Sequence, residues 1–307
     1  MIILLSGTTA SGKSDLSIRL AEDLNGVVIN ADAIQVYKGL SILTDSPDSI
    51  DLRRVPHKLY NYVDGCDDYS VARWIQDVEL EISEACDSNL MPIITGGTGL
   101  YFRLLETGIA KIPAIPESIR CDAHNLINSR GLESVVALLK EEDPATAQLI
   151  DCCNPMRVIR AWEVLKATGI GLAKWWDTPQ YSVLRNRKFI SFTLNTTSKM
   201  MLEMRIKSRA YDMISRGVLD EVANFMRLYS YEVPASKAIG YKDIVDCIKG
   251  DITQQEACDR LYCSTRAYAR RQYKWFKKYM SSWIWVDGIE IDAVYDSIIK
   301  RIKDTCY

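Results

Sequence analysis

Residues 2–14 read IILLSGTTASGKS, an apolar run that passes directly into a glycine-rich turn. The segment from Gly7 to Ser14 fits the pattern G-x-x-x-x-G-K-[ST], in which the glycines let successive backbone N–H groups point at an anion. In this pattern Lys13 adds a point charge to a diphosphate, and the Ser14 hydroxyl binds Mg²⁺. The apolar run before it predicts a strand, and the spacing of Leu16–Leu24 predicts a helix, which is the context such a loop requires. The stretch therefore predicts a polyphosphate site, without deciding whether the ligand is ATP.

Strand-like and helix-like segments alternate along the first hundred residues. Val27–Ile29 and Pro92–Ile94 are strand-like, and the apolar residues of Val71–Ser88 recur with a period near 3.6. A further strand is expected at Lys188–Leu194. This alternation predicts an α/β fold, with a P-loop NTPase-like parallel sheet core and helices on both of its faces.

Between residues 110 and 187 the pattern changes to helices without strands. A proline-rich linker, Lys111–Pro116, introduces the change. Three helices are predicted beyond it, at Glu117–Ser129, Leu132–Lys140 and Asn154–Thr168. We therefore expect two domains: a core made of residues 1–109 and 188–307, and a helical insertion at 110–187.

Composition narrows the classes of function. The 307 residues carry a formal net charge of -2, so strong overall attraction to polyanions is excluded, and any nucleic-acid binding must use a local basic patch. No apolar run reaches the length of a membrane span, so we expect no membrane association. Nine cysteines without a C-x-x-C pair, and only two histidines, argue against zinc and for reduced thiols in a cytoplasmic protein.

A carboxylate follows the second predicted strand. Asp32 ends the segment Val27–Asp32, and ligands of open α/β sheets bind beyond the carboxyl ends of strands. If this strand neighbours the first, Asp32 faces the phosphate loop, where it could accept a proton from a nucleophile or hold a water of a metal ion. A second glycine-rich turn, Thr95–Leu100, offers the hydroxyl of Thr98, although glycine is common in such turns.

One predicted helix is strongly basic. Arg260–Lys278 contains no acidic residue, and its cations fall within an arc of about 140° on a helical wheel. We expect its aromatic residues to face inward. The cations predict a footprint for a phosphate backbone, the alternative being a solvated face. These cations are Arg260, Arg266, Arg270, Arg271, Lys274, Lys277 and Lys278.

Two arginines share a face of another predicted helix. Arg205 and Arg209 lie four residues apart within Met200–Ser215. A guanidinium there could neutralise the charge of a leaving diphosphate. The alternative is a surface ion pair with nearby acids, and the residues alone leave both open.

Ten segments, taken in order, resemble one family: the tRNA dimethylallyltransferases, or bacterial tRNA isopentenyltransferases. The resemblance spans nearly the whole chain and is far more specific than the phosphate loop alone. The segments are Gly7–Ser14, Asn30–Tyr37, Pro56–His57, Tyr69–Val71, Gly96–Tyr101, Arg157–Val164, Arg205–Met213, Gly217–Val222, Ala238–Lys242 and Tyr268–Phe276.

The resemblance implies transfer of a dimethylallyl group from dimethylallyl diphosphate to N6 of adenosine 37 in tRNA, with release of diphosphate and help from Mg²⁺. It implies that the target base is flipped into a channel, and that the helical insertion grips the anticodon stem-loop. We expect the chain to act as a monomer.

The resemblance also implies roles for particular residues. Asp32 would be the general base, Arg209 would stabilise the diphosphate, and Thr98 would join them as a catalytic residue. The diphosphate would be held by Gly7, Thr9, Ala10, Ser11, Gly12, Lys13 and Ser14, with Ser14 on the metal. The tRNA would be touched by Asp32, Ala33, Ile34, Gln35, Thr98, Arg120, Met156, Arg157, Val158, Ile159, Arg160, Lys237, Gly240, Tyr241 and Lys242, together with Arg270, Arg271 and Lys274 of the basic helix.

Two alternatives remain open at this point. A nucleotide-dependent kinase of a small molecule or a polynucleotide end would use the same phosphate loop, and it predicts turnover of ATP. A non-catalytic RNA-binding protein predicts tRNA binding that is indifferent to loss of Asp32 or Lys13.

Overall fold

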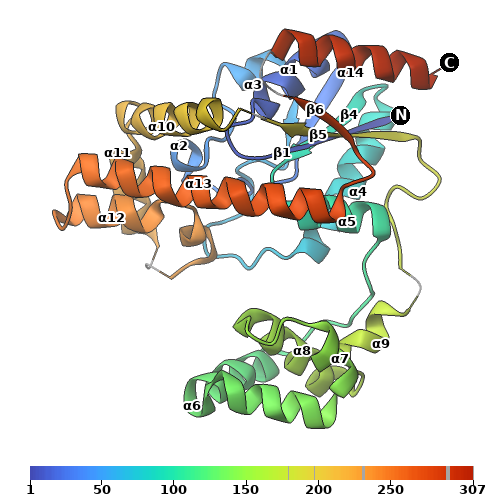
Figure 1. The fold of residues 1–307 in the computed structure, drawn as a ribbon, viewed down its shortest axis with the longest axis vertical. Coiled ribbons are helices and arrows are strands. Elements are labelled where there is room, and N and C mark those ends of the chain that lie inside the picture. The colour runs from blue at the N-terminus through green and yellow to red at the C-terminus, as the bar shows by residue number, and fades with distance from the viewer. Residues whose placement is uncertain (179, 197, 230–231, 288–290, 307) are drawn as a thin grey trace. The chain divides into compact units, whose positions relative to one another are not determined.

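A computed structural model describes residues 1–178, 180–196, 198–229, 232–287 and 291–306 (Figure 1). The chain divides into two compact units, each with a hydrophobic core of its own. The first unit joins Met1–Glu106 to Val183–Tyr307, and the second is Thr107–Ser182. The second unit overlaps the insertion expected at residues 110–187, with both borders a few residues earlier in the chain.

A parallel sheet forms the centre of the first unit. In the described part of the chain it has six strands in the order β3-β2-β4-β1-β5-β6, and every pair of neighbours is parallel. This confirms the expected α/β class and its parallel sheet. The strands are β1 (Ile2–Gly7), β2 (Gly26–Asn30), β3 (His57–Lys58), β4 (Met91–Gly96), β5 (Phe189–Asn195) and β6 (Ile284–Asp287).

The condition attached to the position of Asp32 is not met. It required β2 to neighbour β1, but β4 lies between them. Two strands, β3 and β6, were not predicted at all. β3 has only two residues and β6 only four, which is too short for a periodic pattern to be recognised.

Helices cover both faces of the sheet (Figure 1). On one face, α1 (Lys13–Asp23) and α14 (Ile291–Cys306) share a core with the strands. On the other lie α4 (Val71–Asp87) and α5 (Gly99–Thr107), where Trp74 donates to the backbone oxygen of Asn30 at 2.9 Å. All six residues of β1 are buried, as expected for a strand covered on both sides.

A second helical layer belongs to the same unit. It packs around its own core, which also includes Leu43 and Tyr37 from the segment after β2. None of the helices in the described ranges is long and apolar enough to cross a membrane. The layer contains α2 (Ser41–Thr44), α10 (Lys199–Ser215), α11 (Val218–Leu228), the 3₁₀ turn η1 (Pro234–Lys237), α12 (Tyr241–Lys249) and α13 (Gln254–Tyr279), while α3 (Asp51–Arg54) lies beside α1.

The second unit is helical, as expected. The first two predicted helices form one element, α6 (Glu117–Glu142), interrupted at Gly131, where φ is 77° and ψ is 161°. The predicted gap between Ser129 and Leu132 therefore coincides with a real break. Helix α8 (Pro155–Thr168) matches the third prediction, whereas the short helices α7 (Pro144–Leu149) and α9 (Leu172–Trp176) were missed.

Candidate active site

The glycine-rich turn after β1 adopts the backbone of an anion-binding loop. Gly12 is the N-cap residue of α1 and has a φ of 89°, a conformation that only glycine adopts without strain. Ala10 also has a positive φ, 60°, which costs a residue with a Cβ about 1 kcal/mol. The loop ends on the N-terminus of α1, whose unpaired N–H groups favour a negative ligand.

The loop forms one wall of a cavity of about 680 Å³. Its other walls come from the ends of β2 and β4, from α2, α10 and α13, and from Ile291 at the start of α14. The cavity thus brings together residues from both ends of the first unit. Of the predicted site residues, it is lined by Thr9, Ala10, Gly12, Lys13, Ser14, Asp32, Ile34, Gln35, Arg209, Lys237 and Arg271.

Lys13 reaches back over its own loop. Its ammonium donates to the backbone oxygen of Thr8 at 3.2 Å. Burial lowers the pKa of Lys13 to about 8, the charge of Asp32 opposes that shift, and the nearby guanidinium of Arg209 adds to it. A cation whose burial is only partly compensated is stabilised by the arrival of an anion, which is consistent with the role expected of Lys13.

Asp32 is held rigidly at the end of β2. Its backbone N–H donates to Oδ1 of Asn30 at 2.8 Å, and its own Oδ1 accepts the N–H of Ile34 at 2.9 Å. Among the described residues, the hydrogen bonds that the carboxylate accepts from the backbone all end on Oδ1. The other oxygen, Oδ2, is thus available to a ligand in the cavity. Although β2 is not next to β1, Asp32 and the phosphate loop do line one cavity.

In the second glycine-rich turn, the backbone packs so closely against its neighbours that there is no room for a Cβ. A Cβ on Gly96 would lie 2.2 Å from the backbone oxygen of Ala31, and a Cβ on Gly99 would lie 2.3 Å from Trp275. Thr98 does not line the cavity; its hydroxyl accepts the N–H of Ala33 at 3.0 Å. The turn therefore fixes the backbone on either side of Asp32, and Thr98 contributes to that support.

Gln272 is a site residue that the sequence analysis missed. It lies on α13, is 5% exposed, and lines the cavity. Its oxygen accepts the N–H of Thr9 at 2.8 Å, and its nitrogen donates to the backbone oxygen of Gly97 at 2.9 Å. One amide side chain thus ties the phosphate loop to the second glycine-rich turn. Its position on the inner face of the basic helix was the only available signal.

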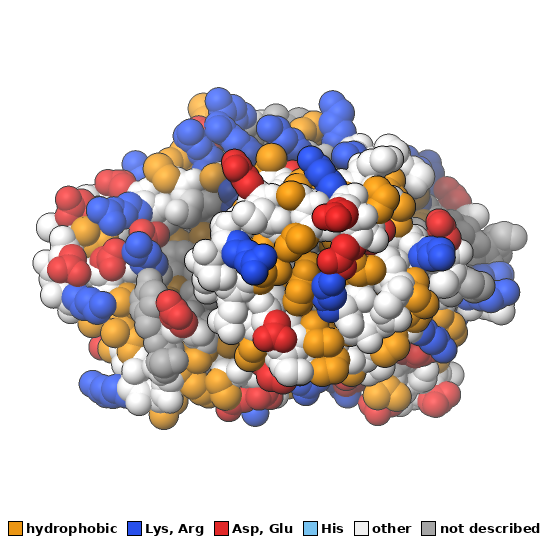
Figure 2. Space-filling view, turned by 90° about the horizontal axis from the view of Figure 1, so that it is seen from below, with side chains coloured by type: hydrophobic (Ala, Val, Ile, Leu, Met, Phe, Trp, Pro, Cys, Tyr) orange, Lys and Arg blue, Asp and Glu red, His pale blue; other side chains and the backbone are white. Residues whose placement is uncertain are grey.

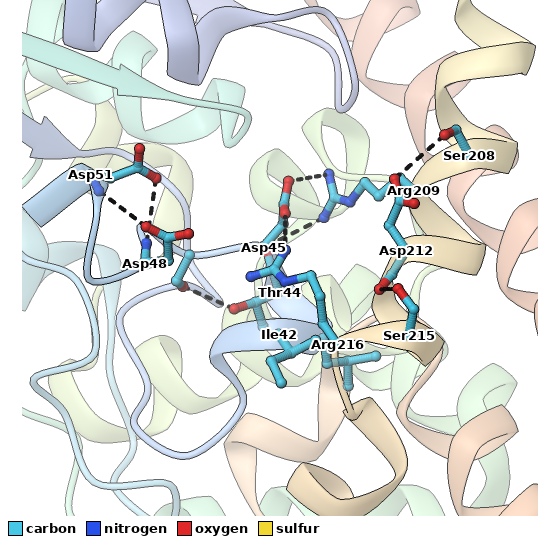
Figure 3. Close-up of polar contacts among 12 residues, drawn as sticks. Ile42, Thr44, Asp45, Asp48, Asp51, Ser208, Arg209, Asp212, Ser215 and Arg216 are labelled. Carbon is cyan, nitrogen blue, oxygen red and sulfur yellow. Dashed lines mark hydrogen bonds and ion pairs between the residues drawn. The ribbon is translucent and has the colours of Figure 1, made fainter.

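Both arginines of α10 reach the phosphate loop. Arg209 donates to the hydroxyl of Thr9 at 2.9 Å, and Arg205 donates to the backbone oxygen of Ser11 at 3.4 Å. Arg209 also forms an ion pair with Asp45 at 3.4 Å, which is the pairing with a nearby acid that the sequence left open (Figure 3). Neutralisation of a diphosphate by these arginines stays a prediction. Arg216 contacts the other oxygen of Asp45 at 3.3 Å.

The basic helix is only partly as expected. Arg260 pairs with Asp246 at 3.8 Å and Arg266 with Glu203 at 3.5 Å, so acids of the protein itself compensate two of the seven cations in the predicted arc. Tyr273 is 38% exposed, so not every aromatic residue faces inward. Arg271 lines the cavity. The exposed remainder of the stripe consists of Arg270, Lys274, Lys277 and Lys278.

The surface of the molecule carries both signs of charge. In Figure 2, Lys and Arg side chains gather along the upper border of the view, and the centre has acids and bases mixed. A nearly neutral chain with locally concentrated cations fits the expectation of a basic patch rather than general attraction to polyanions.

Several residues expected to touch tRNA have buried side chains. Val158, Ile159 and Tyr241 are 0%, 6% and 1% exposed, so their side chains pack inside the protein. This makes a side-chain contact with tRNA at these three positions unfavourable. Gly240 is buried against Leu261, which a Cβ would approach to 2.3 Å. The exposed members of the expected set are Met156, Arg157, Arg160, Lys237, Lys242, Arg270, Arg271 and Lys274, while Arg120 and Ala33 are partly exposed. Gly7 and Ser11 are buried beside the cavity.

Comparison with known sequences gives consistent matches. Residues 35–279 match the family described as IPP transferase, and residues 1–60 match the family described as isopentenyl transferase. The tRNA dimethylallyltransferase of Cereibacter sphaeroides (strain KD131) is 40% identical over 283 residues, covering 92% of this chain and 87% of the relative. That of Ehrlichia ruminantium (strain Welgevonden) is 38% identical over 305 residues, covering 98% and 99%.

Solved structures resemble the chain over nearly all of its length. The full-length tRNA isopentenylpyrophosphate transferase from Bacillus halodurans has a TM-score of 0.68 at 29% identity and covers 99% of this chain and 97% of its own. A eukaryotic dimethylallyltransferase acting on tRNA has a TM-score of 0.79 at 25% identity, covering 95% and 74%. With a match over most of the chain, a shared fold and a phosphate loop facing a carboxylate, the chain belongs to the IPP transferase family.

Proposed function

We propose that the protein transfers a dimethylallyl group from dimethylallyl diphosphate to N6 of adenosine 37 in tRNA and releases diphosphate. The observation that carries the proposal is a single cavity lined by both the phosphate loop and Asp32. Phosphate-binding and proton-accepting groups are what a diphosphate donor and an amine acceptor need. The names of the relatives from Cereibacter and Ehrlichia, both tRNA dimethylallyltransferases, support the choice of substrates.

The donor half of the site would be the phosphate loop with Lys13 and Arg209. Departure of diphosphate from an allylic carbon leaves most of the developing negative charge on the leaving group. The N-terminus of α1, Lys13 and Arg209 all line the cavity where that charge would lie. Thr9 to Ser14 would hold the diphosphate.

Mg²⁺ fits the residues of this half. The exposed Ser14 at the start of α1 lines the cavity, and the acidic residues Asp32 and Asp45 line it too. Mg²⁺ prefers oxygen ligands and is bound by few protein groups together with substrate phosphates. Ser14 would hold the ion, which when bound would neutralise part of the diphosphate charge.

The acceptor half would be built around Asp32. An exocyclic adenine amine is a poor nucleophile, so removal of its proton by the Asp32 carboxylate as the bond to carbon forms would assist the attack. The fixed Oδ1 of Asp32 leaves Oδ2 for this purpose. Thr98, which supports Ala33, would act by keeping the segment after β2 in place. The base must leave its stack to reach this depth.

We propose that tRNA meets the exposed cations of α13 and the helical insertion. Arg270 and Lys274 are exposed and Arg271 lines the cavity, so a phosphate backbone along α13 would pass beside the site. Lys237 and Lys242, and in the second unit Arg157 and Arg160, are further exposed cations. We further propose a monomer that works in the cytoplasm, where its eight described cysteines, all free, stay reduced.

The test is mass analysis of unmodified tRNA after incubation with the protein, Mg²⁺ and either dimethylallyl diphosphate or ATP. The proposal expects one dimethylallyl group per tRNA with the allylic donor and no change with ATP. Consumption of ATP with a phosphorylated product would instead support a kinase. Binding of tRNA without any product would support the non-catalytic alternative.

A further inference from the structure

We propose that Glu221 is a positioning residue for the donor site, which holds the turn Ser41–Asp45 and, through it, the guanidinium of Arg209 against the phosphate loop. The inference rests on the proposed function for the role of Arg209. It concerns a carboxylate that lies on α11, far along the chain from the loop, and that does not line the cavity.

Glu221 caps the short helix α2. Its two oxygens accept the backbone N–H groups of Ile42 at 2.7 Å and of Leu43 at 2.9 Å. The residue before this helix, Leu40, has no side-chain oxygen with which to cap it. The first N–H groups of a helix need an acceptor, so Glu221 supplies from another element what the local sequence lacks.

The capped turn presents two acceptors to Arg209. The backbone oxygen of Thr44 accepts from Arg209 at 3.4 Å, and the carboxylate of Asp45 pairs with it at 3.4 Å (Figure 3). Asp45 has a φ of 57°, so its direction depends on the turn keeping its shape. Gln35 donates to the backbone oxygens of both Thr44 and Asp45 at 3.0 Å and fixes the turn from the other side.

Arg209 completes the connection to the phosphate loop by donating to the Thr9 hydroxyl at 2.9 Å. A guanidinium with five donors in a fixed plane is useful to a diphosphate only if its orientation is set. Hydrogen bonds on two sides, to the α2 turn and to the loop, set that orientation. Loosening the turn should therefore weaken donor binding without changing any group that touches the donor.

Glu221→Gln is the direct test, because the amide keeps the shape but turns a donor toward one of the two N–H groups. The matched control is Asp220→Asn, an exposed residue one position earlier on α11 that loses the same charge. Binding of inorganic diphosphate in the presence of Mg²⁺ is measured by calorimetry. The Michaelis constants for dimethylallyl diphosphate and tRNA are measured separately.

We expect Glu221→Gln to weaken diphosphate binding and raise the donor KM by about tenfold, the effect of disturbing a hydrogen bond to a charged group. The tRNA KM and the Asp220→Asn variant should stay within twofold of the unsubstituted protein. In an Arg209→Lys background, Glu221→Gln should add less than a further twofold, because the residue acts through Arg209.

The inference is overturned by unchanged diphosphate binding, by the same tenfold loss in the Arg209→Lys background, or by an equal rise in both Michaelis constants. If Glu221→Gln does not fold, Glu221→Asp keeps the charge, shortens the reach and should give about a threefold loss; unchanged binding in that variant overturns it. Diphosphate binding without prenyl transfer by the unsubstituted protein would overturn the proposed function alone. An unsubstituted protein that binds no diphosphate would overturn both.

Discussion

The phosphate loop and the wall opposite it are built in different ways, although they face the same cavity. The loop is continuous in sequence, and eight residues from Gly7 to Ser14 contain its chemistry. The opposite wall gathers Arg209, Gln272 and Asp45 from α10, α13 and the turn after α2. A ligand-binding loop can therefore be read locally, whereas the groups that orient it depend on the whole fold of the first unit.

The largest expected effect is that of replacing Asp32, which should lower the rate of the chemical step but not the affinity for tRNA. Asp32→Ala should lower kcat by about 10²- to 10⁴-fold, since the amine loses its proton acceptor. The affinity for tRNA, measured by filter binding, should change little. Asp32→Asn keeps the shape of the side chain and should be as inactive as Asp32→Ala. Full activity in either variant would remove Asp32 from the role of base.

The next effect tests the loop itself. Lys13→Ala should lower kcat/KM for dimethylallyl diphosphate by about 10- to 100-fold, because a charged hydrogen bond to the donor is lost. Steady-state kinetics with varied donor measure it, and the tRNA KM serves as the internal control. Unchanged constants for the donor would show that the diphosphate binds elsewhere.

The pH dependence of kcat/KM for the donor is a second test of the role of Lys13. The pKa of Lys13 lies at about 8 in the free protein, so its ammonium is charged below that pH and becomes neutral above it. Donor kcat/KM should therefore fall as the pH rises through about 8. Lys13→Arg, which stays charged, should move this decline to higher pH. The decline should remain in the Asp220→Asn control.

Gln272 tests the opposite wall. Gln272→Leu removes the acceptor of the Thr9 N–H and the donor to Gly97, and each lost partner of a buried group costs about 1–3 kcal/mol. We expect a lower midpoint of thermal unfolding and about a tenfold rise in the donor KM. A matched control is Tyr273→Leu, which alters the exposed next residue. An unchanged donor KM in Gln272→Leu would mean that the phosphate loop keeps its shape without the hydrogen bond to Gln272.

The smallest effect concerns the outer face of α13. Replacing Arg270, Arg271 and Lys274 by Gln should reduce the slope of log affinity against log salt for tRNA by about 2, if each cation meets one phosphate of a single strand. The paired cations Arg260 and Arg266 give the control, and their replacement should leave the slope nearly unchanged. If both variants had the same salt slope for tRNA binding, the cations of α13 would be a solvated face that does not bind phosphates.

The sequence predicted the parts of the fold whose signal is local. The loop, the strand at Lys188–Leu194 and the break at Gly131 each depend on neighbouring residues, and all three are confirmed. The sequence left the neighbour of β2 open, because strand order depends on contacts between distant segments. Helices of five or six residues, such as α7 and α9, are too short to show a period.

The candidate site shows the same division. Lys13 and Asp32 lie at strand ends, where the position alone suggests chemistry, and both line the cavity. Gln272 bonds to a residue 263 positions away, and no pattern in α13 distinguishes it from a core glutamine. Val158 and Tyr241 were expected at the RNA because of the family resemblance of their segments, yet they pack in cores. A segment that resembles a family motif therefore also includes residues that maintain its shape.

Because Thr9 donates a hydrogen bond to Gln272, α13 has a different role on each of its two faces. Its outer face carries the exposed cations, and its inner face contacts the loop through Gln272. If RNA binds the outer face of α13 and the donor binds the loop, a shift of the helix caused by RNA would alter the affinity for the donor. The donor would then alter the affinity for RNA by the same factor. The order in which RNA and donor are added would then change the order of binding, but not the equilibrium amount of the complex with both ligands.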